Sequence, residues 1–271
     1  MIFVRDKGRM CNNILQYGHL YAWARANNRK TVSMRFAYKY QYFHICRTRW
    51  HNFFVYLLAK YAAKLKLIPT VTFDTPDEDF TEKENAMRCG CLVAEGWFAR
   101  WYDLFLQYKP EILSLFAFDS HIENKVTSLL EASSKEGIIR LGVHIRRGDY
   151  ATWNEGRFLY DDEQMGNIIR QFILLHPNKR VVIYICGNDP KLNKQAYSEA
   201  FGQEYVVFPQ GNPGEDLCLL SHCDYLIGPP STFTLVASMY RNTPLYWIKD
   251  INKPLQEDSF DYFDNLFRNI L

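Results

Sequence analysis

The stretch Gly137 to Tyr150, which reads GIIRLGVHIRRGDY, constrains the fold more than any other part of this 271-residue chain. Its first part, residues 138–145, is apolar and rich in β-branched side chains, and Arg140 is its only charged residue. The run has the length of a strand and is too short for an ordinary helix, so it predicts a buried strand of a parallel sheet. Arg146 and Arg147 follow directly, at the end of the strand where open α/β sheets bind their ligands.

The residues after this strand suit an anionic ligand. A guanidinium can hold a phosphate through two parallel hydrogen bonds, which a lysine cannot do. Gly148 allows the chain to turn at once, and Asp149 is placed to orient one of the arginines. A structural Arg–Asp pair that closes the strand end explains the motif alone equally well. An adhesion signal at Arg147-Gly148-Asp149 is disfavoured, because such a signal needs an exposed flexible tip.

The second half of the chain alternates between strand-like and helix-like segments, which is typical of a doubly wound α/β sheet. Strands are predicted at 138–145, 181–186, 205–208, 225–228 and 245–248. Helices are predicted at 161–176, 190–201, 214–223 and 231–241. The connector 132–137 separates an expected N-terminal α/β domain at 1–136 from a Rossmann-like domain at 137–271. No G-x-G-x-x-G or P-loop sequence occurs, which argues against dinucleotide oxidoreductases and NTPases.

The first half begins with a predicted βαβ unit. Residues 1–5 and 30–34 read as strands, and DKGRMCNN forms a glycine turn before a helix from about Asn12, the expected N-cap. The turn's backbone N–H groups and the helix N-terminus can bind an anion beside Arg9, although the turn alone favours a structural Arg9. Further helices are expected at 51–67, 102–116 (broken at Pro110) and 119–131, and further strands at 70–73 and 91–98.

Charge is distributed unevenly. Residues 1–50 contain ten Lys/Arg and a single acid, Asp6, although the net charge of the chain is only +2. The asymmetry suggests an anionic ligand or surface near this half, while the overall charge does not indicate a nucleic-acid binder. Basic and aromatic residues interleave at 35–50, which suits either single-stranded nucleic acid or the wall of a sugar cleft, and we prefer the cleft.

The cysteines and the N-terminus predict a reduced, cytoplasmic protein. None of the seven cysteines has zinc-site spacing, and the chain enters a strand directly, without a signal peptide. The apolar stretch Phe53–Leu67 is interrupted by three lysines and is too short to span a bilayer. We therefore expect at most peripheral contact with the inner face of a membrane.

Three further features bear on ligands. Asp77 and Asp79 form a D-x-D sequence of the kind that metal-dependent sugar transferases use, but no apolar strand leads into it. A solvated acidic loop is favoured, and no metal site is expected. In GPPSTFT, residues 228–234, Ser231 or Thr232 is placed to cap a helix whose N-terminus suits a phosphate. Asp216 is either an acceptor for a guanine edge or ribose, or a plain helix-start acid.

The H-x-R-R-G-D run, preceded by GRMCNN and followed by EDLCLLSHCDYLIGPPSTF, resembles the fucosyltransferase superfamily. The likeness is greatest to bacterial α-1,2-fucosyltransferases of glycosyltransferase family 11, and it covers nearly the whole chain. It implies a GT-B arrangement of two Rossmann-like halves and GDP-fucose as the donor, bound mainly by the C-terminal half. It also implies inversion at the anomeric carbon and no metal cofactor.

The resemblance assigns roles to individual residues. Arg146 would hold the β-phosphate, His144 would lie against the guanosine, and Asp216 would contact guanine. The other donor-binding candidates are Gly8, Arg9, Asn12, Arg147, Ser231, Thr232 and Phe233. Glu155 and Asp149 are candidates for accepting the proton of the acceptor hydroxyl.

The sequence departs from the family at three points. Residues 8–13 read GRMCNN where relatives often have a second glycine and Asn-Gln. Residues 186–189 read CGND where relatives carry Ser-Asp-Asp, and no Trp-Trp follows PPSTFT. These departures bear on the acceptor more than on the donor.

The sequence thus predicts a fucosyltransferase that modifies a hydroxyl, the 2-OH of a galactoside, in an oligosaccharide or polysaccharide. Two alternatives remain open. One is a non-catalytic protein of the same fold that binds a nucleotide sugar or glycan. The other is an RNA-binding protein that uses residues 25–50.

Overall fold

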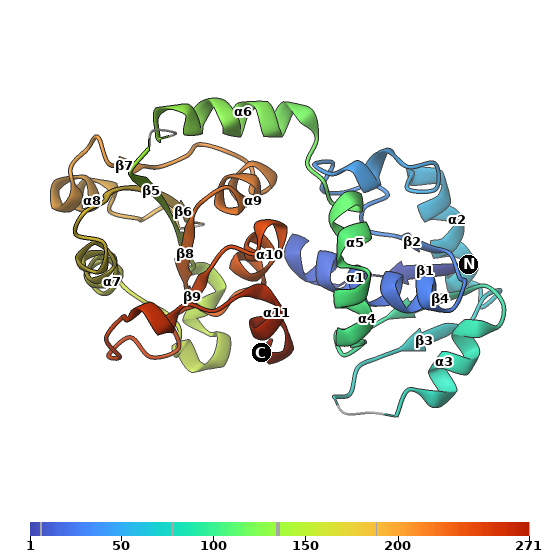
Figure 1. The fold of residues 1–271 in the computed structure, drawn as a ribbon. Helices are drawn as coiled ribbons and strands as arrows, with labels where there is room; N and C mark the ends of the chain where they lie inside the picture. The colour runs from blue at the N-terminus through green and yellow to red at the C-terminus, as the bar shows by residue number, and fades with distance from the viewer. Residues whose placement is uncertain (6, 77–78, 134–135, 188, 271) are drawn as a thin grey trace. The chain divides into compact units, whose positions relative to one another are not determined.

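The structure is a computed structural model and describes residues 1–5, 7–76, 79–133, 136–187 and 189–270. The chain divides into two compact α/β units, Met1–Asp119 and Ser120–Leu271 (Figure 1). Each unit has its own parallel sheet, as expected of two Rossmann-like halves. The division lies earlier than the expected boundary at Gly137, because helix α6 (Ser120–Leu130) packs against a helix of the second unit.

The sheet of the second unit has five parallel strands in the order β7-β6-β5-β8-β9. The strands are β5 (Ile138–Ile145), β6 (Arg180–Gly187), β7 (Val206–Val207), β8 (Tyr225–Gly228) and β9 (Leu245–Trp247). The helices are α7 (Asp162–Leu175), α8 (Lys194–Phe201), α9 (Pro213–Ser221), α10 (Thr232–Arg241) and the short α11 (Phe263–Leu266). All five predicted strands and all four predicted helices are present, so the doubly wound sheet is confirmed. The order reverses between β5 and β8, and sheets of this type bind ligands at that switch point.

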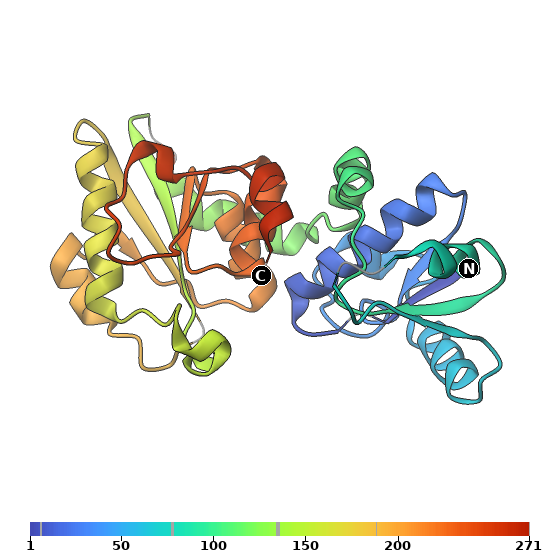
Figure 2. The same ribbon diagram turned by 90° about the horizontal axis from the view of Figure 1, so that it is seen from below.

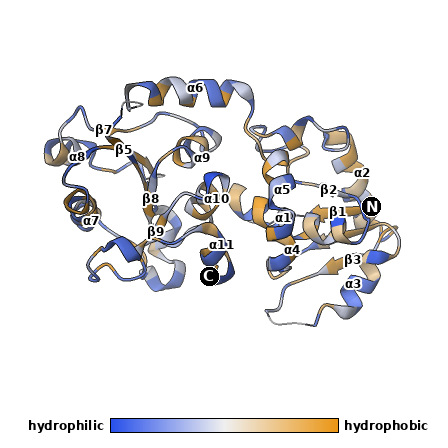
Figure 3. Cartoon of the chain, viewed as in Figure 1, coloured by the Kyte–Doolittle hydropathy of each residue, from blue (hydrophilic) through white to orange (hydrophobic). Residues whose placement is uncertain are grey.

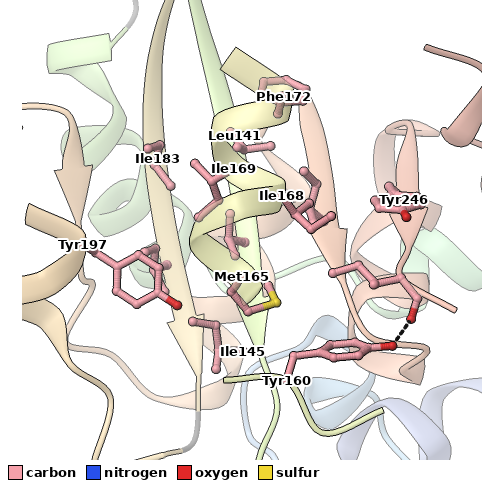
Figure 4. Packing of buried hydrophobic residues seen from close by; sticks show 14 of the residues in the cluster. Leu141, Ile145, Tyr160, Met165, Ile168, Ile169, Phe172, Ile183, Tyr197 and Tyr246 are labelled. Carbon is pink, nitrogen blue, oxygen red and sulfur yellow. Dashed lines mark hydrogen bonds between the residues drawn. The ribbon is translucent and has the colours of Figure 1, made fainter. Parts of the chain in front are cut away.

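Helices cover both faces of this sheet (Figures 1 and 2). Buried side chains of β5 pack against Ile168, Ile169 and Phe172 of α7 on one face, where Tyr197 of α8 joins them (Figure 4). On the other face Gly142 of β5 makes room for α9, since a Cβ there would lie 2.8 Å from Leu220 Cδ2. The strands carry mostly hydrophobic residues (Figure 3). Because helices cover both faces, polar groups of the strands can reach ligands only at the ends of the strands.

The first unit has a four-stranded parallel sheet in the order β2-β1-β4-β3. Its strands are β1 (Ile2–Arg5), β2 (Thr31–Ser33), β3 (Thr70–Thr72) and β4 (Leu92–Glu95). Its helices are α1 (Met10–Ala26), α2 (Phe53–Lys64), α3 (Thr81–Arg88), α4 (Tyr102–Gln107) and α5 (Lys109–Leu115). Helix α1 contacts β1, β2, α4 and α5, whereas α2 lies over Phe3 and Val93, which are paired in register. The expected βαβ unit is present, with β1 parallel to β2.

Three details differ from the expectation. The break in the predicted helix at 102–116 lies at Tyr108, and Pro110 belongs to the first turn of α5. Helix α1 begins at Met10, so Arg9 and not Asn12 occupies the N-cap position. Gly8 turns the chain with φ +88°. The Asn12 side chain lies close to Gly8, and a Cβ at this position would come within 2.8 Å of Asn12 Nδ2. Helix α3 was not predicted; Asp79 starts it by accepting hydrogen bonds from the backbone N–H and hydroxyl of Thr81.

None of the helices within the described ranges is long and apolar enough to cross a membrane.

Candidate active site

Two strand ends meet at the switch point of the second sheet. His144, near the end of β5, is buried, and its ring stacks on Phe233 at the start of α10, with ring centres 4.9 Å apart and planes at 22°. Gly228, the last residue of β8, permits this approach, since a Cβ there would lie 3.0 Å from the carbonyl oxygen of His144. The aromatic stack therefore fixes the start of α10 against the end of β5.

Burial and the nearby guanidinium of Arg146 lower the pKa of His144 to about 3. The imidazole is therefore neutral at physiological pH. Its Nδ1 is buried and has no hydrogen-bond partner among the described residues.

Arg146 extends from the end of β5 and is mostly buried. Its Nη2 donates to Asp149 Oδ2 at 2.9 Å, as the sequence suggested for one of the two arginines. Its guanidinium carbon lies 5.6 Å from the centre of the Tyr150 ring, and the Tyr150 hydroxyl donates to the carbonyl of Pro230. Asp149 and Tyr150 thus hold Arg146 beside the Gly228–Ser231 turn. Arg146 Nε is buried and without a hydrogen-bond partner in the described part of the chain.

Arg147 points to other elements. Its Nε donates to the carbonyl of Tyr160, its Nη1 to Asp189 at 3.1 Å, and its Nη2 to Asp162 at 2.6 Å. Asp162 and Asp189 belong to the start of α7 and the segment after β6. These contacts favour a structural role for Arg147 over the predicted contact with the donor.

The N-terminus of α10 follows β8 directly. The Ser231 side chain caps it by accepting a hydrogen bond from the Phe233 N–H at 3.1 Å, which confirms the predicted cap. Two hydrogen bonds fix the Thr234 hydroxyl: it donates to the Ser231 carbonyl and accepts from Nε1 of Trp247 in β9. The first turn of this ten-residue helix, with Thr232 and Phe233 in it, therefore lies just after the carboxyl end of β8, where sheets of this type bind ligands.

Asp216 lies in the first turn of α9 and is largely buried. Burial and the neighbouring Glu215 raise its pKa to about 6, and Lys125 lowers it by less. Its Oδ1 is buried with no hydrogen-bond partner among the described residues. Asp216 also contributes to raising the pKa of the buried Cys186 thiol at the end of β6. The carboxylate therefore lies close to the same edge of the sheet as His144.

Three buried polar atoms are unsatisfied in the described part of the second unit: His144 Nδ1, Arg146 Nε and Asp216 Oδ1. All three belong to residues that the sequence assigned to the donor. Buried polar atoms are normally hydrogen-bonded, and each exception needs an explanation such as an absent ligand. A neutral imidazole, a guanidinium and a carboxyl group, each with an unsatisfied atom, suit a ligand that carries both a base and phosphates.

The segment after Arg147 contains the second predicted carboxylate. Asn154, Glu155 and Gly156 have consecutive positive φ values of 49°, 57° and 75°. Left-handed conformations of non-glycine residues are costly and cluster at functional sites. Glu155 is exposed, whereas Asp149 is paired with Arg146.

In the first unit, the Gly8 turn and Arg9 lie at the start of α1, as predicted. Sequence reasoning missed Asn13, which is fully buried in the first turn of α1. Neither end of its amide has a hydrogen-bond partner within the described ranges. The sequence did contain a signal for Asn13: it is a polar amide directly before Ile14 and Leu15, which belong to the predicted apolar face of the helix.

A pocket of about 280 Å³ opens beyond β1 and β2 in the same unit. It is lined by Arg5, Met34, Arg35, Tyr38, Tyr56 and Lys60. The rings of Tyr38 and Tyr56 lie 4.5 Å apart, and Arg35 Nη1 donates to the Tyr38 hydroxyl at 2.9 Å. Arg5 is paired with Glu95 at 3.0 Å. Basic side chains beside a pair of tyrosine rings suit a sugar, which offers both hydroxyl groups and an apolar ring face.

The structure removes two aromatic rings of residues 25–50 from any contact with RNA. Phe36 and Phe43 are fully buried and pack against Phe116, with ring centres 5.0 and 5.6 Å away. Bases cannot stack on these rings.

One group of possible metal ligands occurs in the described part of the chain, formed by Glu123, Cys218 and His222. His222 Nε2 lies 3.3 Å from Glu123 Oε2, and its Nδ1 lies 2.9 Å from the Cys218 carbonyl. These residues surround the later part of α9, where the chain turns back towards β8, away from Asp216 in the first turn. Asp77 of the D-x-D sequence, and Asn188 after β6, lie outside the described residues.

Comparison with known proteins relates the chain and its fold to one class of transferase. No family model matches the chain. The chain is 22% identical to the mouse galactoside 2-alpha-L-fucosyltransferase Sec1 over 266 residues, which cover 94% of this chain and 68% of the mouse protein. A FUT1 variant of Arabidopsis thaliana in complex with GDP superposes with a TM-score of 0.64 at 12% identity, covering 96% of this chain and 73% of that one. The fold is that of the fucosyltransferases.

Two other solved structures agree. The NodZ alpha-1,6-fucosyltransferase soaked with GDP-fucose gives a TM-score of 0.57 at 15% identity and covers 96% of this chain and 98% of NodZ. POFUT1 in complex with GDP also gives 0.57, at 12% identity, and covers 89% of this chain and 94% of POFUT1. The GT-B-like fold and the predicted resemblance to the fucosyltransferase superfamily are thus confirmed.

We predict that Asp216→Asn stabilises the protein at high pH only. The folded-state pKa of Asp216, about 6, lies above its ordinary value of 3.8. Well below pH 3.8 the carboxyl is protonated in both folded and unfolded chains, so wild type and variant should be equally stable. Between pH 3.8 and about 6 the unfolded wild type loses this proton while the folded wild type keeps it, so the wild type should become less stable than the variant by about 3 kcal/mol, and the difference should stay constant above pH 6. Thermal unfolding from pH 4 to 8 measures this difference.

Asp258→Asn, which changes an exposed carboxylate, is the matched control and should show no such pH dependence. A stability difference between Asp216→Asn and wild type that is constant over this range would contradict the assignment of a raised pKa to Asp216.

Proposed function

We propose that the protein transfers L-fucose from GDP-fucose to a glycan hydroxyl, with inversion at the anomeric carbon. The observation that carries the proposal is that His144, Arg146 and Asp216, at the carboxyl end of β5 and the start of α9 in a fucosyltransferase fold, each have a buried side-chain atom without a hydrogen-bond partner among the described residues. Relatives with this fold are described in complex with GDP or GDP-fucose, which supports the same donor here. The mouse relative acts on galactosides, which supports the 2-OH of a galactoside as the acceptor position.

The second unit can recognise each part of the donor. Asp216, when ionised, accepts hydrogen bonds from the guanine N–H groups, and the neutral His144 presents its Nδ1 towards the nucleoside. Arg146 Nε and the first turn of α10 face the diphosphate. The aromatic stack of His144 on Phe233 keeps these groups at fixed positions relative to one another.

Arg146 stabilises the leaving GDP. Negative charge grows on the β-phosphate as the glycosidic bond breaks, and a preoriented guanidinium in a mostly dry site stabilises that charge without reorganisation. Its bond to Asp149 and the adjacent Tyr150 ring provide the orientation. With Arg146 and the α10 N-terminus in place, the diphosphate requires no divalent cation.

Glu155 is the carboxylate that we assign to the acceptor proton. Asp149 is engaged with Arg146, whereas Glu155 is exposed in a strained turn that begins six residues after the arginine pair. The pocket of the first unit would hold the acceptor sugar itself, against the paired rings of Tyr38 and Tyr56.

A non-catalytic sugar-binding role is the remaining alternative, and slow hydrolysis of GDP-fucose in the absence of acceptor would exclude it. Salt-dependent RNA binding by residues 25–50 would instead revive the nucleic-acid hypothesis.

We predict that Arg146→Ala lowers kcat for fucose transfer roughly a hundredfold, equivalent to about 3 kcal/mol, because it removes an interaction that strengthens in the transition state. Arg146→Lys should recover little of the lost rate, since a point charge does not replace the planar guanidinium. Initial rates with EDTA present measure both variants, and EDTA should leave the wild-type rate unchanged.

Arg157→Ala, which removes an exposed arginine of the same loop, is the matched control and should retain normal turnover. Arg147→Ala should lose thermal stability first, because Asp162 and Asp189 would be left unpaired. A well-folded Arg146→Ala enzyme with near-normal kcat would overturn the role given to Arg146.

We predict that Glu155→Gln lowers kcat roughly a hundredfold and leaves GDP affinity unchanged, as expected for loss of a general base. Titration calorimetry with GDP and initial-rate kinetics measure the two effects separately. Glu163→Gln, an exposed carboxylate at the start of α7, is the control. Normal turnover of Glu155→Gln would remove Glu155 from the mechanism.

We predict that Tyr56→Ala raises KM for a soluble acceptor roughly tenfold, with little change in donor KM, because the ring forms part of the acceptor pocket. Tyr61→Ala, an exposed tyrosine of the same helix outside the pocket lining, is the matched control. Equal acceptor KM values for the two variants would refute the placement of the acceptor in this pocket.

A further inference from the structure

Helix α2 exposes a continuous row of large apolar side chains. Phe54, Leu58, Tyr61 and Leu65 follow one another at helical spacing and are 77%, 72%, 51% and 67% exposed. We call these four residues the α2 ridge. At about 100° of rotation per residue they fall within one narrow sector of the helix surface.

The ridge is the outer side of a helix that buries little. Ala59 is the only residue of α2 that is fully buried, where it packs with Met34 and Val93. Flanking side chains extend the apolar area on the same segment: Trp50, Phe53 and Leu67 are 46%, 52% and 74% exposed. Single exposed hydrophobic residues are ordinary, but a contiguous group on one helix marks an interaction surface.

The charge around the ridge identifies the kind of partner. Residues 7–73 contain twelve Lys/Arg and no Asp or Glu. Lys64 and Lys66 stand beside Leu65 at the end of the helix, and the Arg49 guanidinium lies 5.0 Å from the Trp50 ring just before it. An apolar stripe with aromatic residues and flanking lysines is typical of helices that lie in the interface of an anionic bilayer. A protein partner with both acidic and basic residues fits this surface less well, because residues 7–73 offer no carboxylate to pair with its basic side chains.

We propose that the α2 ridge, with Trp50, Phe53 and Leu67, binds the surface of a membrane that contains anionic lipids. The apolar side chains enter the boundary between headgroups and acyl chains, while Lys64 and Lys66 remain at the level of the lipid phosphates. The contact is peripheral, since α2 has 12 residues and is far shorter than a membrane span. The proposal does not depend on the transferase activity.

The test is sedimentation of the full chain with phosphatidylcholine vesicles that contain or lack phosphatidylglycerol. We expect the protein to sediment with the anionic vesicles and to be released by added salt. Phe54→Ser/Leu58→Ser should weaken this binding at least roughly tenfold, because it removes inserted apolar area. Lys64→Gln/Lys66→Gln should weaken it roughly tenfold and reduce the salt dependence.

Leu174→Ser is the matched control, since Leu174 of α7 is 76% exposed but has no comparable surroundings. It should bind vesicles as wild type does. The Phe54→Ser/Leu58→Ser variant should keep the circular dichroism spectrum of the wild type, which shows that the variant is folded.

Failure of the wild type to bind anionic vesicles, or equal binding by wild type and Phe54→Ser/Leu58→Ser, would overturn the proposal. The α2 ridge could instead bind a second copy of the chain, and sedimentation velocity without vesicles tests this alternative. A dimer that this double variant dissociates, together with absence of vesicle binding, would assign the ridge to self-association instead.

Discussion

The candidate site depends on the partly buried ion pairs of Arg147. This residue joins the end of β5 to the start of α7 and to the segment after β6 through Asp162 and Asp189. Two neighbouring residues of an extended chain project to opposite sides. Because Arg147 is fixed on the side of α7, Arg146 is directed towards β8 and α10. One arginine of the pair therefore stabilises the fold, and the other is left with an unsatisfied Nε at the ligand edge.

The second unit was more predictable than the first because parallel strands buried on both faces leave a strong pattern in the sequence. The predicted strands at 138–145 and 225–228 match β5 and β8 in full. Helix α3 was missed because Asp79, which accepts a hydrogen bond from the first residue of the helix, is one of several acidic residues in this segment, and the sequence does not single it out. The early start of α1 depends on the Gly8 backbone, a left-handed turn that a search for capping side chains does not detect.

The residue types at the site were predictable, but their environments were not. The sequence placed His144, Arg146 and Asp216 at strand ends and helix starts, which follows from topology. It did not give the stack of His144 on Phe233, the burial of Asp216 or the missing partners of Asn13, because each results from packing between segments far apart in the chain. The pocket and the α2 ridge have the same origin, since both depend on which side of α2 meets the sheet.

The two sides of α2 have a geometric consequence for the choice of acceptor. Tyr56 lines the pocket and lies about half a turn around the helix from Phe54 and Leu65. A helix with its side chains is about 10 Å across, so a ridge seated in the headgroup layer would hold the pocket within roughly that height of the lipid phosphates. Only the sugars nearest the anchor of a lipid-linked glycan would reach it. Such an enzyme would select its acceptor by distance from the membrane as well as by the shape of the sugar.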